Sequence, residues 1–359
     1  MSLAEGIGSV AGNSACRPFM RLCIRTTDSH TAAGATSVPH LSDNVQLVAQ
    51  ICKALGDEMR VQIVRLLARE TFGVQELARI FAVPQPLMSH HLKVLSQAGV
   101  LTPRRQGNVI FYRRQLGSTH DVASGLRRSI FASLDEVPLN DAQQQTIAAI
   151  HEDRSVQSRE FFTRFATKFS QRQAQLCESS QYLSNVSELL DVMGLAKDAR
   201  VMEVGPGEGQ LLAELAQRFS HVTALDNSKE MLEVAKARTA HLEQKIQFVH
   251  GAVDTLSREK RGVFDAVVLN MVLHHVASPQ AALSKLADVL ATEGYLLIAD
   301  LCLHSQDWVR ESCGDVWLGF DSEELDGWAR AAHLQCQHSL FLGLKNGFQI
   351  LLKLFRKVS

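Results

Sequence analysis

The spacing of apolar residues in the first third of the chain changes in a regular order. Apolar positions recur at helical spacing in two runs separated by Gly56, which predicts two helices between residues 45 and 67. The segments FGVQELARIFAV (72–83) and PQPLMSHHLKVLSQAGV (84–100) predict two shorter helices, with a turn at Val83–Pro84 and a stop at Gly99. VLTPRRQGNVIFYRR (100–114) then predicts a β-hairpin around Gln106–Gly107–Asn108.

Further along, the period changes again. Residues 119–198 follow a mostly helical pattern, and short apolar runs such as ARVMEVG, HVTALD and FDAVVLN then alternate with helical stretches. Near-continuous apolar strands between helices indicate a parallel sheet covered on both faces. We therefore predict a multi-domain chain with these parts: a disordered segment over 1–40, a winged helix-turn-helix (mainly α with a β-hairpin wing) over 41–118, a helical linker or dimerisation region over 119–175, and an α/β Rossmann-like domain over 176–359.

Composition places the chain among ordinary globular proteins. Hydrophobic residues make up 46% and charged residues 21%, and no apolar run is long enough for a membrane span. The 7 cysteines lack a paired framework, and no secretory signal pattern opens the chain. These features favour a cytoplasmic protein without a membrane partner.

The net charge of −1 conceals a local asymmetry. No Asp or Glu occurs between Leu77 and His120, whereas the same stretch contains six basic residues: Arg79, Lys93, Arg104, Arg105, Arg113 and Arg114. Such a patch attracts a polyanion, because binding releases condensed counterions. Charge alone leaves two interpretations open, a nucleic-acid-binding surface and a solvated basic face.

A glycine-rich loop follows the first predicted strand of the C-terminal half. VMEVGPGEGQLL places Gly205, Gly207 and Gly209 between a strand and a helix, where a ligand can approach the backbone. Asp226 ends the next strand, at a distance along the chain that suits contact with a ribose. The loop lacks the G-x-x-x-x-G-K-[ST] pattern of nucleoside triphosphate sites, and its spacing differs from the dinucleotide G-x-G-x-x-G.

With these residues, the segment from about 176 to 300 resembles the class I S-adenosylmethionine-dependent methyltransferases. The resemblance implies a loop under the methionine part of S-adenosylmethionine (SAM) and an acid on its ribose. The usual adenine-binding acid is replaced by Ala252, so adenine recognition is expected either to use backbone N–H groups around Ala252 and Val253 or to be weakened. The implied cofactor residues are Glu203, Gly205, Gly207, Gly209, Asp226, Asn227, Ala252, Val253 and Asn270.

Two adjacent histidines follow the fourth strand in NMVLHHV. His274 or His275 is a candidate general base or substrate-positioning group, and the alternative is that both pack at a strand-to-helix corner. Adjacent residues of an α-helix point about 100° apart, so on a helix the two rings would not share a metal ion. The catalytic residue therefore stays unassigned, and no metal site is predicted.

The N-terminal half resembles the ArsR/SmtB family of bacterial repressors. KALGDEMRVQIVRLL, VQELARIFAVPQPLMSHHLKVLSQAGVL and RRQGNVIFYR carry the match in consecutive order. The family's thiolate positions hold Gly73 and Gln75 here, which disfavours metal sensing. The resemblance implies a homodimer on double-stranded operator DNA, with these DNA contacts: Gln85, Ser89, His90, Lys93, Arg104, Arg105 and Tyr112. His91 points about 100° away from His90 and is expected to pack at the junction of helix and wing.

Two functions combine these halves. In the first, a repressor binds SAM or S-adenosylhomocysteine (SAH) and changes its operator affinity in response. In the second, a small-molecule methyltransferase uses its DNA-binding half only for autoregulation. Base methylation of nucleic acid is disfavoured, because NMVLHH stands where the D/N-P-P-[FYW] box of base amino-methyltransferases is expected.

Overall fold

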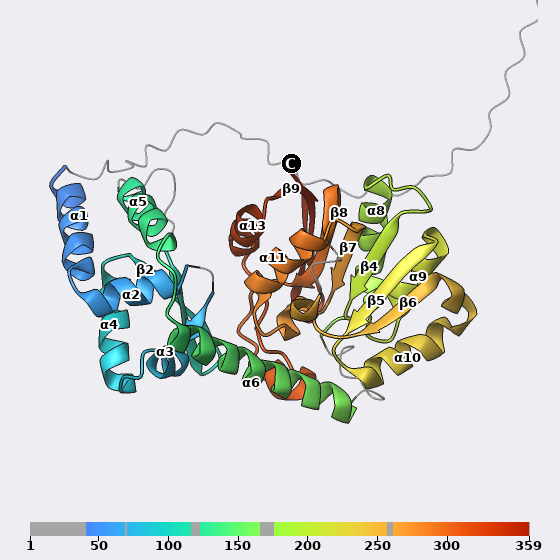
Figure 1. The fold of residues 1–359 in the computed structure, drawn as a ribbon, viewed down its shortest axis with the longest axis horizontal. Helices are drawn as coiled ribbons and strands as arrows, with labels where there is room; N and C mark the ends of the chain where they lie inside the picture. Colours follow the sequence, from blue (N-terminus) through green and yellow to red (C-terminus); the bar gives the residue numbers. More distant parts are fainter. Residues whose placement is uncertain (1–40, 69, 116–122, 166–175, 257–260, 359) are drawn as a thin grey trace, which may run out of the picture. The chain divides into compact units, whose positions relative to one another are not determined.

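The computed structural model describes residues 41–68, 70–115, 123–165, 176–256 and 261–358. The segment 1–40, for which disorder is predicted, lies outside the described residues. The N-terminal half begins with α1 (Leu41–Leu55), α2 (Glu58–Leu66), β1 (Phe72–Gly73), α3 (Val74–Ile80) and α4 (Gln85–Gln97). The strands β2 (Leu101–Gln106) and β3 (Val109–Arg114) follow and pair with β1 in the order β1-β3-β2. The predicted winged helix-turn-helix is confirmed (Figure 1).

Local sequence explains these boundaries. The side chain of Asp57 accepts a hydrogen bond from the Arg60 backbone N–H at 3.0 Å and starts α2. Pro84 and Pro86 stand at the start of α4, where a missing N–H costs little. Gly99 follows α4 with a φ of 66°, the left-handed conformation that ends many helices.

Two helices, α5 (Ser124–Asp135) and α6 (Asp141–Phe165), lie between the winged helix and the sheet domain in the sequence. Phe131 of α5 and Ile150 of α6 pack in the apolar core of the winged helix, with Ile51, Leu77 and Leu95. The described part of the expected 119–175 region is therefore helical, and it is packed against the DNA-binding half.

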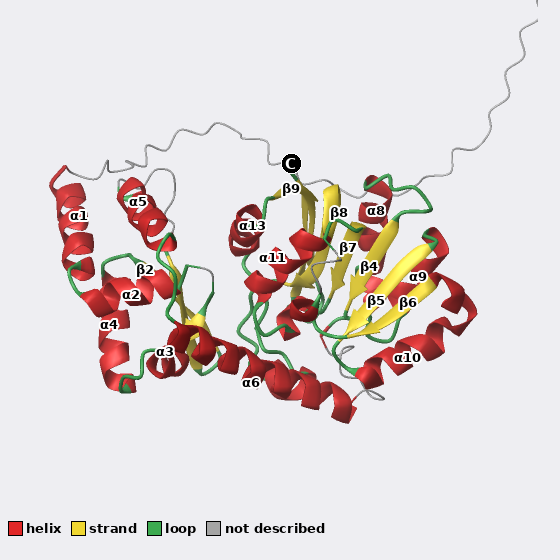
Figure 2. Cartoon of the chain, in the orientation of Figure 1, coloured by secondary structure: helices red, strands yellow, loops and turns green. Residues whose placement is uncertain are grey.

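The C-terminal half is built on a seven-stranded sheet in the order β6-β5-β4-β7-β8-β10-β9. The first five strands in this order are parallel to their neighbours, whereas β10 runs antiparallel to both β8 and β9. The strands are β4 (Arg200–Val204), β5 (His221–Asp226), β6 (Ile246–His250), β7 (Phe264–Asn270), β8 (Leu290–Leu301), β9 (Leu334–Gly343) and β10 (Gln349–Lys357). Figure 2 shows this sheet in yellow between helices, so the predicted α/β sheet is confirmed.

Apolar side chains fill both faces of the sheet. Alternate residues of one strand point to opposite faces, so Val201 and Met202 of β4 belong to different cores. The helices α8 (Leu183–Val192) and α9 (Gln210–Arg218) cover one face. The helices α11 (Pro279–Val289) and α13 (Ser322–Ala331) cover the other (Figure 1), and two further helices are α10 (Lys229–Thr239) and α12 (Val309–Cys313).

Within the described residues, no helix is both long and apolar enough to cross a lipid bilayer.

Candidate functional site

The candidate cofactor site lies at the carboxyl ends of β4 and β7, which are neighbours in the sheet. The chain proceeds from β4 to β5 and β6 on one side and returns with β7 on the other side of β4. Ligands of open α/β sheets bind at such a reversal of strand order, outside the carboxyl ends of the strands. The glycine loop after β4 and the NMVLHHV segment after β7 therefore meet at the expected place.

Two glycines of the loop have conformational roles. Gly205 has a φ of 64°, and a Cβ there would lie 2.3 Å from Cγ2 of Val272. Gly209 has a φ of 80° at the start of α9, and a Cβ there would lie 3.2 Å from the backbone of Ala235. Gly205 thus lets the loop approach the segment after β7, and Gly209 lets the start of α9 approach the helix that contains Ala235.

Two adjoining cavities share this loop. The first is lined by Gly205, Gly207, Asp226, Asn227, Ala252 and Val253, and the second by Gly205, Gly207 and Asn270. The structure thus brings together seven of the nine residues expected to bind cofactor. The other two, Glu203 and Gly209, do not line either cavity and lie buried next to the loop.

Asp226 is placed to accept hydrogen bonds from a ligand. It ends β5, lines the first cavity, and its Oδ1 accepts a hydrogen bond from the Ser228 backbone N–H at 2.8 Å. Burial raises its pKa to about 6, although the backbone N–H groups of Ser228 and Asn227 oppose the shift. The carboxyl group is therefore ionised at neutral pH.

Glu203 is different, because its side chain is buried within β4 with 1% exposure. Burial raises the pKa of Glu203 to about 8, and the nearby carboxylates of Asp226 and Glu214 add to the shift. Its Oε2 has no hydrogen-bond partner among the described residues. At neutral pH this residue is a protonated carboxylic acid beneath the loop.

The first cavity also has a wall that sequence reasoning missed. His151, Ser155, Ser158 and Phe162, all on α6, line it together with the residues of the sheet domain. Their spacing of three or four residues places them on one face of the helix. The sequence predicts this helix but does not indicate that it packs beside the glycine loop, because the loop lies about fifty residues further along the chain.

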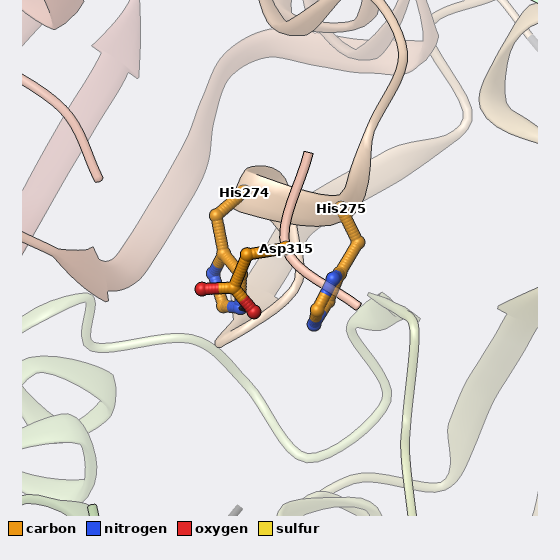
Figure 3. A group of neighbouring side chains, drawn as sticks. All are labelled: His274, His275 and Asp315. Carbon is orange, nitrogen blue, oxygen red and sulfur yellow. Dashed lines mark ion pairs between the residues drawn. The ribbon is translucent and has the colours of Figure 1, made fainter. Parts of the chain in front are cut away.

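His274 and His275 lie in η6 (Leu273–His275), a short 3-10 helix, and both are buried. Their ring centroids are 4.0 Å apart, so the divergence expected of adjacent residues on an α-helix does not apply. Nδ1 of His274 lies 2.7 Å from Oδ1 of Asp300, and Nε2 lies 3.8 Å from Oδ1 of Asp315. Figure 3 shows both rings descending from one turn and the Asp315 carboxylate reaching them from a separate segment.

The two histidines differ electrostatically. Burial alone would lower the pKa of His274, but the carboxylates of Asp300 and Asp315 outweigh it and raise the pKa to about 9. Burial lowers the pKa of His275 well below its usual value, and the neighbouring His274 adds to this. His275 is therefore neutral, and of the two only it lines the first cavity. The packing interpretation fits His274, whereas His275 lines the cavity and stays a candidate for the catalytic or positioning role.

On the winged helix, α4 presents most of the expected DNA-contacting residues. Gln85, Ser89 and Lys93 recur every four residues on an exposed face, and His90 beside them is also exposed. Met88, Leu92 and Leu95 occupy the buried face. His91 is buried, with Nδ1 3.7 Å from Oδ1 of Asp57, as expected for a packing residue.

The wing differs from expectation. Arg104 is buried, its Nη1 donates to Oε2 of Glu324 at 2.5 Å, and its Nη2 donates to the backbone oxygen of Gly319. Tyr112 is buried in the core of the winged helix, although Arg105 is exposed. Gln106 accepts a hydrogen bond from Arg310 at 3.2 Å. In this structure Arg104 is thus withheld from a DNA backbone because the wing packs on the sheet domain, and Tyr112 because its side chain lies in the winged-helix core.

Most basic residues of the stretch 77–120, which contains no Asp or Glu, pair with acidic residues from distant segments. Arg79 pairs with Asp153 at 2.7 Å, Arg114 pairs with Asp135 at 2.7 Å, and Glu324 lies beside both Arg104 and Arg113. Lys93 and Arg105 make no ion pair with the described residues. The basic surface is therefore smaller than the sequence suggests and centres on α4 and the turn of the wing.

Helix α6 connects the two halves through polar contacts. Buried Arg154 contacts Glu76 of α3 and donates to the backbone oxygen of Ala277, which lines the first cavity. One residue away along α6, Asp153 accepts from Arg79 of α3. The same helix that forms a wall of the cavity is thus bonded to the helix-turn-helix.

Comparison with known proteins agrees with both resemblances. Residues 202–298 match the family model described as a methyltransferase domain, and residues 57–102 match the model of the arsR family of bacterial regulatory proteins. Each family prediction is confirmed for its own segment. Together the matched segments fall short of half the chain.

Two named methyltransferases each match about a third of this chain. An uncharacterized methyltransferase of Mycobacterium bovis is 34% identical over 134 residues, which is 35% of this chain and 66% of that protein. A ubiquinone biosynthesis O-methyltransferase of Xanthomonas oryzae is 34% identical over 119 residues, 33% of this chain and 48% of that protein. The N-methyltransferase NodS of Bradyrhizobium japonicum, solved with SAH, is 17% identical, with 56% of this chain and 99% of that chain covered and a TM-score of 0.46. The chain thus spans less than two thirds of the curated relatives it matches.

Proposed function

We propose that this protein is a DNA-binding transcriptional regulator whose affinity for its operator depends on SAM or SAH bound at the carboxyl ends of β4 and β7. The observation that carries the proposal is the double role of α6. This helix lines the cavity with Ser155, Ser158 and Phe162 and contacts the helix-turn-helix through Arg154. A ligand changes an equilibrium only by binding one state more tightly than another, and α6 touches both sites.

The residues of the cavities suit such a cofactor. The ionised Asp226 carboxylate would accept hydrogen bonds from ribose hydroxyls, and the loop would lie beside the ligand because Gly205 and Gly207 line both cavities. Oδ1 of Asn270 is buried without a hydrogen-bond partner among the described residues, so it would accept one from the amino group of the ligand's methionine part. Ala252 and Val253 line the cavity as the resemblance implies for the adenine.

The DNA-binding part of the proposal rests on α4. Gln85, Ser89, His90 and Lys93 form an exposed polar surface on the helix that the resemblance places in the major groove. A homodimer on a palindromic operator is expected from the same resemblance. Light scattering of the chain alone and on operator DNA would establish this stoichiometry.

The test measures operator affinity as the ligand is titrated. DNA that the full chain selects from a random duplex pool supplies the operator, and fluorescence anisotropy measures its Kd with and without saturating SAH or SAM. We expect a change of about fivefold or more, the usual range of allosteric coupling. Asp226→Ala should abolish the effect, whereas Asp288→Ala, an exposed acid outside both cavities, should preserve it. An unchanged Kd at saturating ligand contradicts the proposal.

A second candidate function is methylation of a small molecule. The neutral imidazole of His275 lines the cofactor cavity, and the matched relative from Xanthomonas oryzae is named as an O-methyltransferase. Bound SAM supplies an electrophilic methyl group. His275 would accept the proton of an acceptor hydroxyl, and the apolar side chains of Phe162 and Val272 would exclude water.

The test of this second function measures SAH release against phenolic and aliphatic hydroxyl acceptors. We expect turnover that falls at least about a hundredfold in His275→Ala, the usual size of a general-base effect. His338→Ala, an exposed histidine on β9, is the matched control. Absence of turnover with every acceptor contradicts the enzymatic function and leaves the ligand-sensing proposal unaffected.

A further inference from the structure

A cluster of metal-ligating side chains lies beside the cofactor cavity. His274, His275 and Asp315, here called the His–Asp cluster, each offer one ligand atom, and these atoms lie within 4.8 Å of one another. All three residues are buried. Figure 3 shows the two rings side by side and the Asp315 carboxylate beside the His274 ring, although Asp315 comes from a segment forty residues further along the chain.

Hydrogen bonds fix the ring nitrogens in the orientation that a metal ligand needs. Nδ1 of His274 lies 2.7 Å from the carboxylate of Asp300 and donates its proton there, so Nε2, which faces Asp315, is the nitrogen that would give up its proton to bind an ion. Nδ1 of His275 donates to the backbone oxygen of Gly314 at 3.0 Å, which leaves its Nε2 as the unprotonated nitrogen. Histidines that bind metals almost always donate their other ring N–H to a carboxylate or a backbone carbonyl, as both do here.

Asp315 supplies an independent observation. Its side chain is fully buried, and neither carboxylate oxygen has a hydrogen-bond partner among the described residues. A buried carboxylate without partners is costly unless a cation or donors satisfy it. The distance of 3.8 Å to Nε2 of His274 is too long for a hydrogen bond. An ion bound between these atoms would satisfy both.

We propose that the His–Asp cluster binds one divalent transition-metal ion through Nε2 of His274, Nε2 of His275 and the Asp315 carboxylate. Two imidazoles and one carboxylate suit Zn²⁺, Fe²⁺ and Co²⁺ better than Mg²⁺ or Ca²⁺, which prefer oxygen ligands. Ligand atoms about 2.1 Å from a tetrahedral metal lie about 3.4 Å apart, so small side-chain rotations close the site. Because His275 lines the cofactor cavity, the coordination position left open is reached from there.

The metal-free alternative is a buried ion pair between a protonated His274 and the carboxylates of Asp300 and Asp315. It leaves Nε2 of His275 and both Asp315 oxygens without a hydrogen-bond partner among the described residues. The metal site uses all of these atoms. Its test requires neither DNA binding nor methyl transfer, so it is separate from those of the proposed functions. A metal ion on Nε2 of His275 would replace the general-base role given to that nitrogen in the second candidate function.

The experiment titrates the full chain, freed of metal by dialysis against a chelator, with Co²⁺ and follows its visible d–d absorption. We expect one Co²⁺ per chain, a spectrum of nitrogen and oxygen ligation without thiolate charge-transfer bands, and displacement by Zn²⁺. Asp315→Asn and His275→Ala should each weaken binding at least tenfold, whereas His338→Ala on the exposed face of β9 should bind as the wild type does.

Circular dichroism and the thermal midpoint establish that each variant is folded. If both variants are unfolded, the wild-type titration alone tests the proposal, because the stoichiometry and the absorption spectrum of bound Co²⁺ are measured without any variant. Absence of a d–d band at saturating Co²⁺, or unchanged affinity in folded Asp315→Asn and His275→Ala, overturns the proposal in favour of the ion pair.

Discussion

Arg154 of α6 holds both carboxylate oxygens of Glu76 of α3, through Nε at 2.9 Å and through Nη2 at 2.6 Å. Its third nitrogen, Nη1, donates to the backbone oxygen of Ala277 at 3.0 Å, and its guanidinium lies 4.8 Å from the ring centroid of Trp317. One buried cation therefore contacts the helix-turn-helix and the wall of the cofactor cavity. This arrangement is the physical basis of the proposed coupling between ligand and DNA.

Arg154→Lys is expected to uncouple the two sites. Lysine keeps the charge but cannot bond both oxygens of Glu76 and Ala277 at once. We expect SAH affinity to stay within about threefold of the wild type. The coupling free energy between SAH and operator should fall by about 0.5–2 kcal/mol, the usual size of a change at a residue that couples two sites. The matched control is Arg159→Lys, whose guanidinium pairs only with Glu152 of the same helix among the described residues. Equal coupling in all three proteins would show that Arg154 does not transmit the signal.

His90→Ala should weaken operator binding and leave cofactor affinity intact. The side chain is exposed on α4, whose buried face packs on the winged-helix core. A lost base contact costs about 1–3 kcal/mol, and the site preference should relax at the contacted base. Gln97→Ala, at the exposed C-terminal end of the same helix, serves as control. A loss of SAH binding in His90→Ala would contradict the division of roles between the halves.

Lys93 and Arg104 should respond differently to salt. Lys93 is exposed and free of ion pairs with the described residues, whereas Arg104 is buried against Glu324. Lys93→Ala is therefore expected to reduce the slope of log Kd against log salt by about 1, and Arg104→Ala to leave it unchanged. Operator titrations at several salt concentrations give both slopes. A reduced slope in Arg104→Ala would mean that the wing leaves the sheet domain when DNA binds.

Glu203 makes stability depend on pH. Burial raises its pKa from 4.5 to about 8. Between pH 4.5 and pH 8, the carboxyl group is therefore protonated in the folded state and ionised in the unfolded state. Because the folded state binds more protons, the free energy of unfolding contributed by this residue falls as pH rises toward 8. Glu203→Gln removes the dependence.

Thermal and urea midpoints at pH 6 and pH 9 provide the measurement. From pH 6 to pH 9, the free energy of unfolding should fall by on the order of 1–3 kcal/mol more in the wild type than in Glu203→Gln. Glu233→Gln, an exposed residue paired with Lys236, should behave like the wild type. Equal losses in wild type and Glu203→Gln would contradict the raised pKa.

Local patterns predicted the elements of both halves. The spacing that places Met88, Leu92 and Leu95 on one side of α4 also predicts that Ser89 and Lys93 face solvent. The glycine loop and Asp226 could be assigned from the sequence because each stands directly after its strand, and strand ends converge at one edge of a parallel sheet.

Contacts between distant segments were not predictable in this way. Arg104 and Glu324 are separated by 220 positions, so nothing near Arg104 in the sequence indicates its burial. Asp315 follows β8 in the chain and stands forty residues beyond His275, and the α6 wall of the cavity depends on how a predicted helix packs. The separation of His274 and His275 was misjudged because an α-helix was assumed where a 3-10 turn forms.

The central claim is tested most directly by titrating SAH calorimetrically into the full chain, first alone and then saturated with its operator duplex. Because coupling free energy is reciprocal, DNA must change the Kd of SAH by the same factor by which SAH changes the Kd of DNA. We predict a change of about fivefold or more, equal in the two experiments. An SAH affinity that is the same with and without bound operator would contradict the account.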